Sequence, residues 1–191
     1  MRVISGKFKG KKLFAPGDNR VRPTTDRIKE TLFNILAAKG LCGEVTVLDL
    51  FGGSGALGIE AMSRGATKTV FIDKDPASIS LIKTNLAHVG AKPYEYEVYN
   101  VDFSFALKKL KDKHFDVIFA DPPYAAGLEN AIMETIDKYN VLSATGVLVI
   151  EHSADVDFAT ETYGEDRRVC GNTILSFLTL NETGISEGDK S

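Results

Sequence analysis

The sequence predicts an α/β fold in which helices cover both faces of a mainly parallel sheet. Short, nearly continuous apolar runs at 45–50, 69–72 and 115–120 are typical of strands buried on both faces. Stretches of helical periodicity separate these runs, as expected when crossover helices join parallel strands. A glycine-rich segment at 52–58 directly follows the first run. Strand, glycine loop and helix in that order indicate a ligand-binding turn.

The remaining elements follow from periodicity and from the residues that begin or end each segment. Residues 2–5 and 8–14 predict a small N-terminal hairpin that ends at Ala15-Pro16-Gly17. Thr24 or Thr25 can cap the next helix, whose apolar positions Ile28, Leu32, Ile35 and Leu36 share one face. Further helices are expected at 59–64, 76–88, 103–110 and 128–139, and further strands at 94–99, 146–151, 166–170 and 174–180. A turn at Gly171-Asn172 joins the last two strands, so one strand should be antiparallel.

The glycine loop has the features of a cofactor site. Glycines let a ligand approach the backbone, and the following helix offers unpaired N–H groups. Asp73 ends the second strand about 20 residues beyond the loop, the usual spacing for a carboxylate that binds ribose hydroxyls. The expected cofactor-binding residues are Asp49, Phe51, Gly52, Gly53, Ser54, Gly55 and Asp73.

The identity of the cofactor depends on Asp49. The glycines at 53, 55 and 58 also fit a dinucleotide pattern, so NAD is the weaker alternative. Asp49 would repel a pyrophosphate, but it could accept hydrogen bonds from the ammonium group of S-adenosylmethionine. No set of residues suited to hydride transfer is apparent. The sequence therefore favours S-adenosylmethionine and methyl transfer.

A second motif, Asp121-Pro122-Pro123-Tyr124, directly follows the run 115–120. Ligands of open α/β sheets bind at the carboxyl ends of the strands. A carboxylate, two prolines that hold their carbonyl groups in a fixed direction, and an aromatic ring suit a flat ring that bears an amine. The motif indicates a nucleobase clamp, although an ordinary strand-ending turn is the alternative for the tetrapeptide alone.

Charge is unevenly distributed along the chain. Residues 1–40 contain ten Lys and Arg residues against three Asp and Glu residues, a net +7, whereas the whole chain has a net charge of -3 and the remainder therefore -10. A basic segment on an acidic protein favours nucleic-acid binding, with a solvated lysine-rich hairpin as the alternative. The expected RNA contacts are Arg2, Lys7, Lys9, Lys11, Lys12, Arg22 and Arg27.

Length and composition predict one domain over residues 1–182, with a basic extension at 1–40, a catalytic core at 41–182 and a disordered tail at 183–191. The 191 residues include no apolar run long enough to span a membrane and no secretory segment. We therefore expect a cytoplasmic protein, and a monomer. Cys42 and Cys170 should be reduced thiols, and no metal site is expected because the histidines form no cluster.

The chain resembles the RsmD family of 16S ribosomal RNA guanine-N(2) methyltransferases over nearly its whole length. The resemblance is carried by residues 2–6, 22–27, 30–34, 48–51, 53–58 and 121–124. It implies a Rossmann-like, class I S-adenosylmethionine-dependent methyltransferase sheet of seven strands with an N-terminal β-hairpin extension. It also implies methylation of one guanine in small-subunit ribosomal RNA, either naked or in a 30S assembly particle. Cys170 departs from the family, in which an aromatic residue often occupies this position.

The resemblance adds two cofactor contacts. Asp102 resembles the position that contacts the adenine amine of the cofactor, and Phe103 beside it is the other expected contact. A helix N-cap is the alternative for Asp102.

A mechanism follows from the clamp. If the Asp121 carboxylate and the Pro122 carbonyl accept the two amine hydrogens, the nitrogen lone pair is directed at the methyl group, and positioning does most of the work. Tyr124 would stack on the base, which must be flipped out to enter. Asp121 can also take the proton after transfer.

Three alternatives remain open. The first is amino-methylation of another base, such as adenine N(6), and the second is a non-catalytic RNA-binding protein. The third is a hydrolase that uses Ser54, Asp121 and His152.

Overall fold

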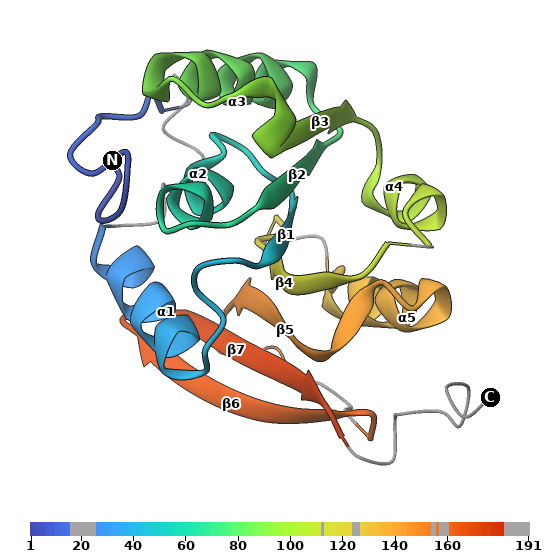
Figure 1. Cartoon of the computed structure of the whole chain (residues 1–191). Helices are drawn as coiled ribbons and strands as arrows, with labels where there is room; N and C mark the ends of the chain where they lie inside the picture. Colours follow the sequence, from blue (N-terminus) through green and yellow to red (C-terminus); the bar gives the residue numbers. More distant parts are fainter. Residues whose placement is uncertain (16–25, 112, 124–126, 154–155, 157–160, 182–191) are drawn as a thin grey trace.

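The computed structural model describes residues 1–15, 26–111, 113–123, 127–153, 156 and 161–181. They contain a seven-stranded sheet in the order β3-β2-β1-β4-β5-β7-β6 (Figure 1). The strands are β1 Thr46–Leu50, β2 Lys68–Asp73, β3 Tyr96–Asn100, β4 Phe115–Ala120, β5 Leu142–His152, β6 Tyr163–Cys170 and β7 Thr173–Leu180. Strands β1 to β5 pair in parallel, and β7 is antiparallel to both β5 and β6. The predicted mixed α/β sheet with one antiparallel member is confirmed.

Helices cover both faces of this sheet (Figure 1). They are α1 Asp26–Ala38, α2 Ala56–Ser63, α3 Pro76–Val89, α4 Phe103–Lys109 and α5 Glu129–Tyr139, with a 3-10 turn, η1, at Pro93–Glu95. Helices α1, α2 and α3 pack on one face, and α4 and α5 pack on the other. The threonines expected to cap α1 lie outside the described residues.

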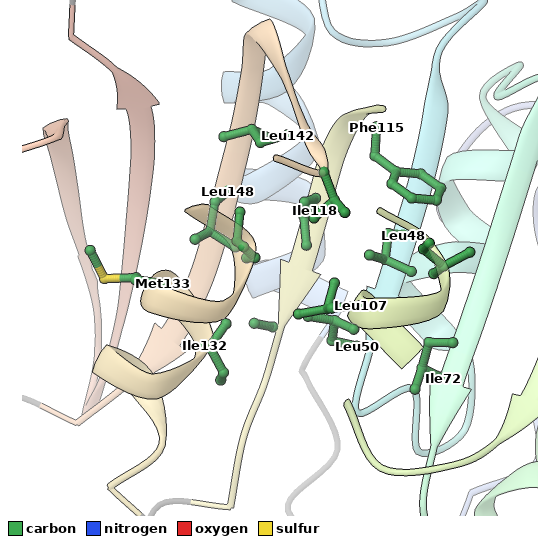
Figure 2. Packing of buried hydrophobic residues seen from close by; sticks show 14 of the residues in the cluster. Leu48, Leu50, Ile72, Leu107, Phe115, Ile118, Ile132, Met133, Leu142 and Leu148 are labelled. Carbon is green, nitrogen blue, oxygen red and sulfur yellow. The ribbon is translucent and has the colours of Figure 1, made fainter. Parts of the chain in front are cut away.

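The core explains why the strands are almost uniformly apolar. On the α4–α5 face, Leu107 and Ile132 pack onto Leu48, Ile118 and Leu148 (Figure 2). The alternate strand positions, such as Val47, Phe119 and Val149, form a second cluster with α1 and α2. Side chains of a strand covered on both faces must be apolar at every position. A polar residue buried inside these strands therefore indicates a role other than packing of the apolar core.

Four sequence-based starts need correction, of which two are that α2 begins at Ala56 instead of Ile59 and β6 begins at Tyr163 instead of Asp166. The strand expected at 94–99 begins at Tyr96, because Pro93–Glu95 forms the 3-10 turn. Pro93 has no N–H to donate, and the Glu95 carboxylate accepts a hydrogen bond of 2.8 Å from the Lys92 N–H. Strand β5 begins at Leu142, earlier than the expected Gly146. The turn at Gly171-Asn172 joins the paired residues Cys170 and Thr173, as predicted.

The expected hairpin strands at 2–5 and 8–14 reduce to one antiparallel bridge between Arg2 and Lys12. A tight turn occupies the interval, and at Gly6 (φ +80°) an added Cβ would lie 1.7 Å from the Ser63 carbonyl oxygen. We call residues 1–15 the N-terminal arm. Its side chains Val3, Phe8 and Leu13 are buried in one cluster with residues of α2 and α3. The arm is therefore an integral part of the packed structure.

Candidate active site

The glycine loop lies between β1 and α2 at the carboxyl edge of the sheet. Gly53 and Gly55 have φ values of +56° and +76°, a left-handed conformation that suits glycine. The Gly52 N–H donates to the Ile72 carbonyl over 2.9 Å, which holds the loop against the end of β2. At the end of the glycine-rich segment, an added Cβ at Gly58 would lie 2.3 Å from the Phe71 Cε1 atom. The loop therefore needs glycine for both conformation and space.

Asp49 is the polar residue that interrupts β1, and only 3% of its surface is exposed. Its Oδ2 atom accepts a hydrogen bond of 3.0 Å from the Gly58 N–H, near the start of α2. Burial raises the pKa of Asp49 to about 8, Asp73 adds to the increase, and the Gly58 N–H opposes it. Within the described residues its Oδ1 atom accepts no hydrogen bond. Contact with the methionine end of a cofactor stays a prediction for Asp49.

Asp73 connects the end of β2 to the loop. Its Oδ2 atom accepts from the Gly53 N–H over 2.9 Å, and its Oδ1 atom accepts from the Asp75 N–H over 2.8 Å. A carboxylate oxygen can accept more than one hydrogen bond, so Asp73 can shape the loop and still receive ribose hydroxyls. The ribose contact stays a prediction.

Asp102 is the N-cap of α4, the alternative that the sequence left open. Its Oδ1 atom accepts from the Ser104 N–H over 2.9 Å and from the Ser104 hydroxyl over 2.7 Å. The neighbouring Phe103 ring lies 5.5 Å from the Phe51 ring, centroid to centroid. This half-buried aromatic pair lies between the start of the glycine loop and the start of α4. The predicted adenine contact of Asp102 and the cofactor contact of Phe103 are not tested by this geometry.

Asp121 follows β4 directly, with Pro122 buried and Pro123 exposed beside it. Its carboxylate accepts no hydrogen bond from any described residue. Part of its surface is open to solvent, yet burial by surrounding protein raises its pKa well above the ordinary value, and the charges of Glu151 and Asp49 raise it further. Tyr124 lies outside the described residues.

Glu151 is an acidic neighbour of Asp121 that the sequence analysis missed. Strands β4 and β5 pair in parallel with Ala120 opposite Ile150, so Asp121 and Glu151 come next at the same level. Continued alternation places both on the face that carries Phe119 and Val149. Glu151 is 8% exposed. A carboxylate at the end of an apolar strand was the available signal, but its proximity to Asp121 required the strand register.

The lysines of the N-terminal arm divide into two groups. Lys7 forms an ion pair with Glu95, and the Lys11 ammonium donates to the Val89 carbonyl over 2.7 Å. Lys9 and Lys12 are exposed, and their ammonium groups have no partner among the described residues. These two lysines are therefore available to an external ligand.

The arginines of the predicted RNA surface differ too. Arg2 lies 3.2 Å from the Asp26 carboxylate in an exposed ion pair, and Arg27 is exposed on α1. Arg22 lies outside the described residues.

The hydrolase alternative is not supported. The Nδ1 atom of His152 lies 2.8 Å from the Ser153 carbonyl oxygen, and its Nε2 atom lies 2.8 Å from the Ser176 hydroxyl. The hydroxyl of Ser54 contacts the Met1 sulfur at 3.8 Å. His152 is fully buried, and strand alternation points it to the face opposite Glu151.

Among the described residues, no group of His, Cys, Asp and Glu could hold a metal ion, and no helix is long and apolar enough to cross a membrane.

Comparison with known proteins gives consistent matches. A family model described as "Conserved hypothetical protein 95" matches residues 1–178. Ribosomal RNA small subunit methyltransferase D of Haemophilus influenzae is 35% identical over 161 residues, which cover 84% of this chain and 82% of that protein.

Solved structures agree. A hypothetical protein of Thermus thermophilus is 30% identical with a TM-score of 0.82, and the match covers 94% of this chain and 99% of that chain. SMU.776, whose crystal structure is a complex with SAH, is 17% identical with a TM-score of 0.65, over 84% of this chain and 50% of that chain, which shows a shared fold alone. The chain therefore belongs to the ribosomal RNA small subunit methyltransferase D family, RsmD, and has its Rossmann-like class I methyltransferase fold.

Proposed function

We propose that this protein transfers a methyl group from S-adenosylmethionine to the exocyclic N(2) amine of a guanine in small-subunit ribosomal RNA. The observation that carries the proposal is the half-buried Asp121 carboxylate, which has no hydrogen-bond partner among the described residues and lies one strand away from the glycine loop. The name of the Haemophilus influenzae relative supports ribosomal RNA as the substrate.

The residues of the glycine loop fit the proposed cofactor. Gly53 has open space where a Cβ would project, apart from the Phe51 carbonyl at 3.8 Å, so a ligand can approach its backbone. Asp49 and Asp73 place two carboxylates at the loop, which suits a cofactor that has cationic groups and ribose hydroxyls. S-adenosylmethionine would supply an electrophilic methyl group there.

Asp121 has the properties that the amine substrate needs. A guanine amine is a poor nucleophile because its lone pair is delocalised into the ring, so orientation of that amine is the main task of the site. A carboxylate without protein partners can accept an amine hydrogen. Its raised pKa also makes Asp121 a better acceptor for the proton that leaves the nitrogen after transfer.

Glu151 beside Asp121 supports guanine over adenine. The Watson–Crick edge of guanine presents two adjacent donors, the N1–H group and the N2 amine, whereas adenine presents its amine beside the N1 acceptor. Ionised carboxylates only accept hydrogen bonds. An ionised carboxylate of this pair therefore matches a guanine donor and would repel an adenine N1 atom, whereas a carboxyl that the raised pKa keeps protonated would donate instead.

The RNA is proposed to bind along the N-terminal arm, chiefly through Lys9 and Lys12. A net charge of +7 over residues 1–40 attracts phosphates to an otherwise acidic protein. The target base must then be unstacked to reach the edge of the sheet.

The test is transfer of a labelled methyl group to naked small-subunit RNA and to assembled 30S particles, with the modified nucleotide mapped. The proposal expects one guanine N(2) mark on at least one of these substrates. A mark on adenine N(6) would overturn the guanine assignment, and RNA binding without methyl transfer would favour the non-catalytic alternative.

A further inference from the structure

Asn85 joins the two ligand-binding regions. It lies in α3 and is fully buried. One Nδ2 hydrogen donates to the Phe14 carbonyl over 3.0 Å, the other donates to the Ser54 carbonyl over 2.8 Å, and Oδ1 accepts from the Phe14 N–H over 2.8 Å. Phe14 is near the end of the N-terminal arm, and Ser54 is in the glycine loop. This side chain therefore connects the backbone of the proposed RNA-binding arm to the backbone of the proposed cofactor loop, beside the weaker contact of the Ser54 hydroxyl with the Met1 sulfur.

The chemistry of these contacts requires an amide. The two carbonyl oxygens need donors and the Phe14 N–H needs an acceptor, and an amide side chain provides both. Leaving partly buried backbone groups unpaired is unfavourable, so the bond from Nδ2 holds the Ser54 carbonyl in one direction while the two bonds with Phe14 fix Asn85 to the arm. Ser54 lies between the left-handed Gly53 and Gly55, and Asn85 holds its carbonyl whereas Asp73 holds the Gly53 N–H.

The start of the arm is held by separate contacts. The Glu60 carboxylate on α2 accepts from the Ile4 N–H over 2.8 Å and from the Ser5 N–H over 3.0 Å. The Phe8 N–H donates to the Ser63 hydroxyl over 2.9 Å. These bonds fasten the arm without touching the glycine loop. Among the described residues, Asn85 is the only one whose side chain hydrogen-bonds both to the backbone of the arm and to the backbone of the glycine loop.

We propose that Asn85 is a positioning residue that couples RNA binding on the arm to cofactor binding in the glycine loop. The inference rests on the proposed function, which assigns these two ligands. RNA bound to Lys9 and Lys12 stabilises the arrangement in which Phe14 and Asn85 are hydrogen-bonded, and so favours the Ser54 orientation that receives the cofactor. By thermodynamic reciprocity, the bound cofactor strengthens RNA binding by the same factor.

The experiment is a binding cycle with a small-subunit ribosomal RNA fragment and S-adenosylhomocysteine, which allows no turnover. In the unsubstituted protein each ligand should raise the affinity for the other by at least about fivefold, the lower end of typical coupling. Asn85→Ala should weaken S-adenosylhomocysteine binding by about tenfold without RNA. Its coupling factor should fall to about one, as expected for independent sites.

Ser63→Ala is the matched control, because it removes an arm contact and leaves Ser54 untouched. It should keep the coupling factor of the unsubstituted protein. Thermal unfolding shows whether each variant is folded.

Hydrogen exchange in the unsubstituted protein gives a second readout that needs no variant. RNA alone should slow exchange of the amides at 53–55, and unchanged exchange would overturn the coupling. A folded Asn85→Ala protein with unaltered coupling would overturn the role of Asn85. Protein that binds both ligands independently would overturn this inference and leave the proposed function intact. Failure to bind either the RNA fragment or the 30S particle would overturn both.

Discussion

The two halves of the carboxyl edge use their acidic residues differently. Beside the glycine loop, Asp49 and Asp73 accept hydrogen bonds from backbone N–H groups of the loop and of the helix that follows it. Across β4 and β5, Asp121 accepts none from the described residues and lies at the same level as Glu151. The first pair holds the backbone of the loop and of α2, whereas Asp121 has no such bond within the described part of the chain, as its proposed role in binding a substrate requires. Acidic residues along one sheet edge therefore differ in whether their carboxylates are already bonded to the backbone, and this difference decides which of them can accept hydrogen bonds from a substrate.

The largest effect is expected at Asp121. Asp121→Asn keeps the shape of the side chain but removes its charge and its capacity to take a proton. Methyl transfer should fall by about 100-fold to 10,000-fold, the range for loss of a general base. Calorimetry should find S-adenosylmethionine affinity nearly unchanged. Near-normal turnover in this variant would contradict a role for Asp121 in methyl transfer.

Glu151→Gln should reduce transfer to guanine by roughly 10-fold to 150-fold, since hydrogen bonds to charged groups contribute about 1.5–3 kcal/mol. The reason is that the side-chain amide of the introduced Gln, in one of its two orientations, points its NH2 group at the N–H donors of guanine. Steady-state kinetics on RNA should locate the loss, with thermal unfolding as the check on folding. If Glu151→Gln protein prefers guanine over adenine as strongly as the unsubstituted protein does, Glu151 has no role in base recognition.

Asp73→Ala tests the role of the acidic residues beside the glycine loop. Removal of the carboxylate releases the Gly53 and Asp75 N–H groups and any ribose contact. Cofactor affinity should fall by about 10-fold to 100-fold on the basis of charge-assisted hydrogen bonds. Asn at this position is the matched control, because its Oδ1 atom can still accept from the loop. Unchanged calorimetric affinity in folded Asp73→Ala protein would remove the ribose assignment.

Asp49 should make stability depend on pH. Its folded pKa, about 8, lies above its ordinary value of 3.8, so the folded protein binds more protons than the unfolded chain between these values. Its contribution to the free energy of unfolding therefore decreases as pH rises from about 4 to about 8. Asp49→Asn should remove this decrease. Relative to the unsubstituted protein, its Tm should rise between pH 5.5 and 8.5 by about 2–4 °C for each kcal/mol. A Tm difference that stays constant over this range would contradict the raised pKa.

The smallest effect is expected on the N-terminal arm. Lys9→Gln combined with Lys12→Gln should weaken RNA binding and flatten the log-affinity against log-salt slope by roughly 0.7 to 0.9 for each phosphate that the variant no longer neutralises. Lys108→Gln, on an exposed lysine of α4 on the opposite face of the sheet, is the matched control. Cofactor affinity without RNA should not change. Equal slopes for the double variant and the unsubstituted protein would favour a merely solvated arm.

Local signals were enough to predict most of the fold. Each of the strands β1, β2 and β4 is an apolar run bounded by polar or glycine residues, and the helices over 76–88 and 128–139 follow apolar spacing. The structure confirms these elements with small shifts at their ends. The N-terminal strands were overestimated because close packing of Gly6 on Ser63 cannot be read from the residues of the arm alone.

The sequence by itself determined the order strand, glycine loop, helix and the positions of Asp49, Asp73 and Asp121 at strand ends, because these features depend on neighbours along the chain. Only the tertiary structure decided which polar groups have partners. Lys7 meets Glu95 across 88 positions, and Asn85 meets Phe14 across 71. Glu151 reaches Asp121 only through the register of β4 and β5. Such pairings depend on how strands and helices pack in space, and local periodicity carries no information about that packing.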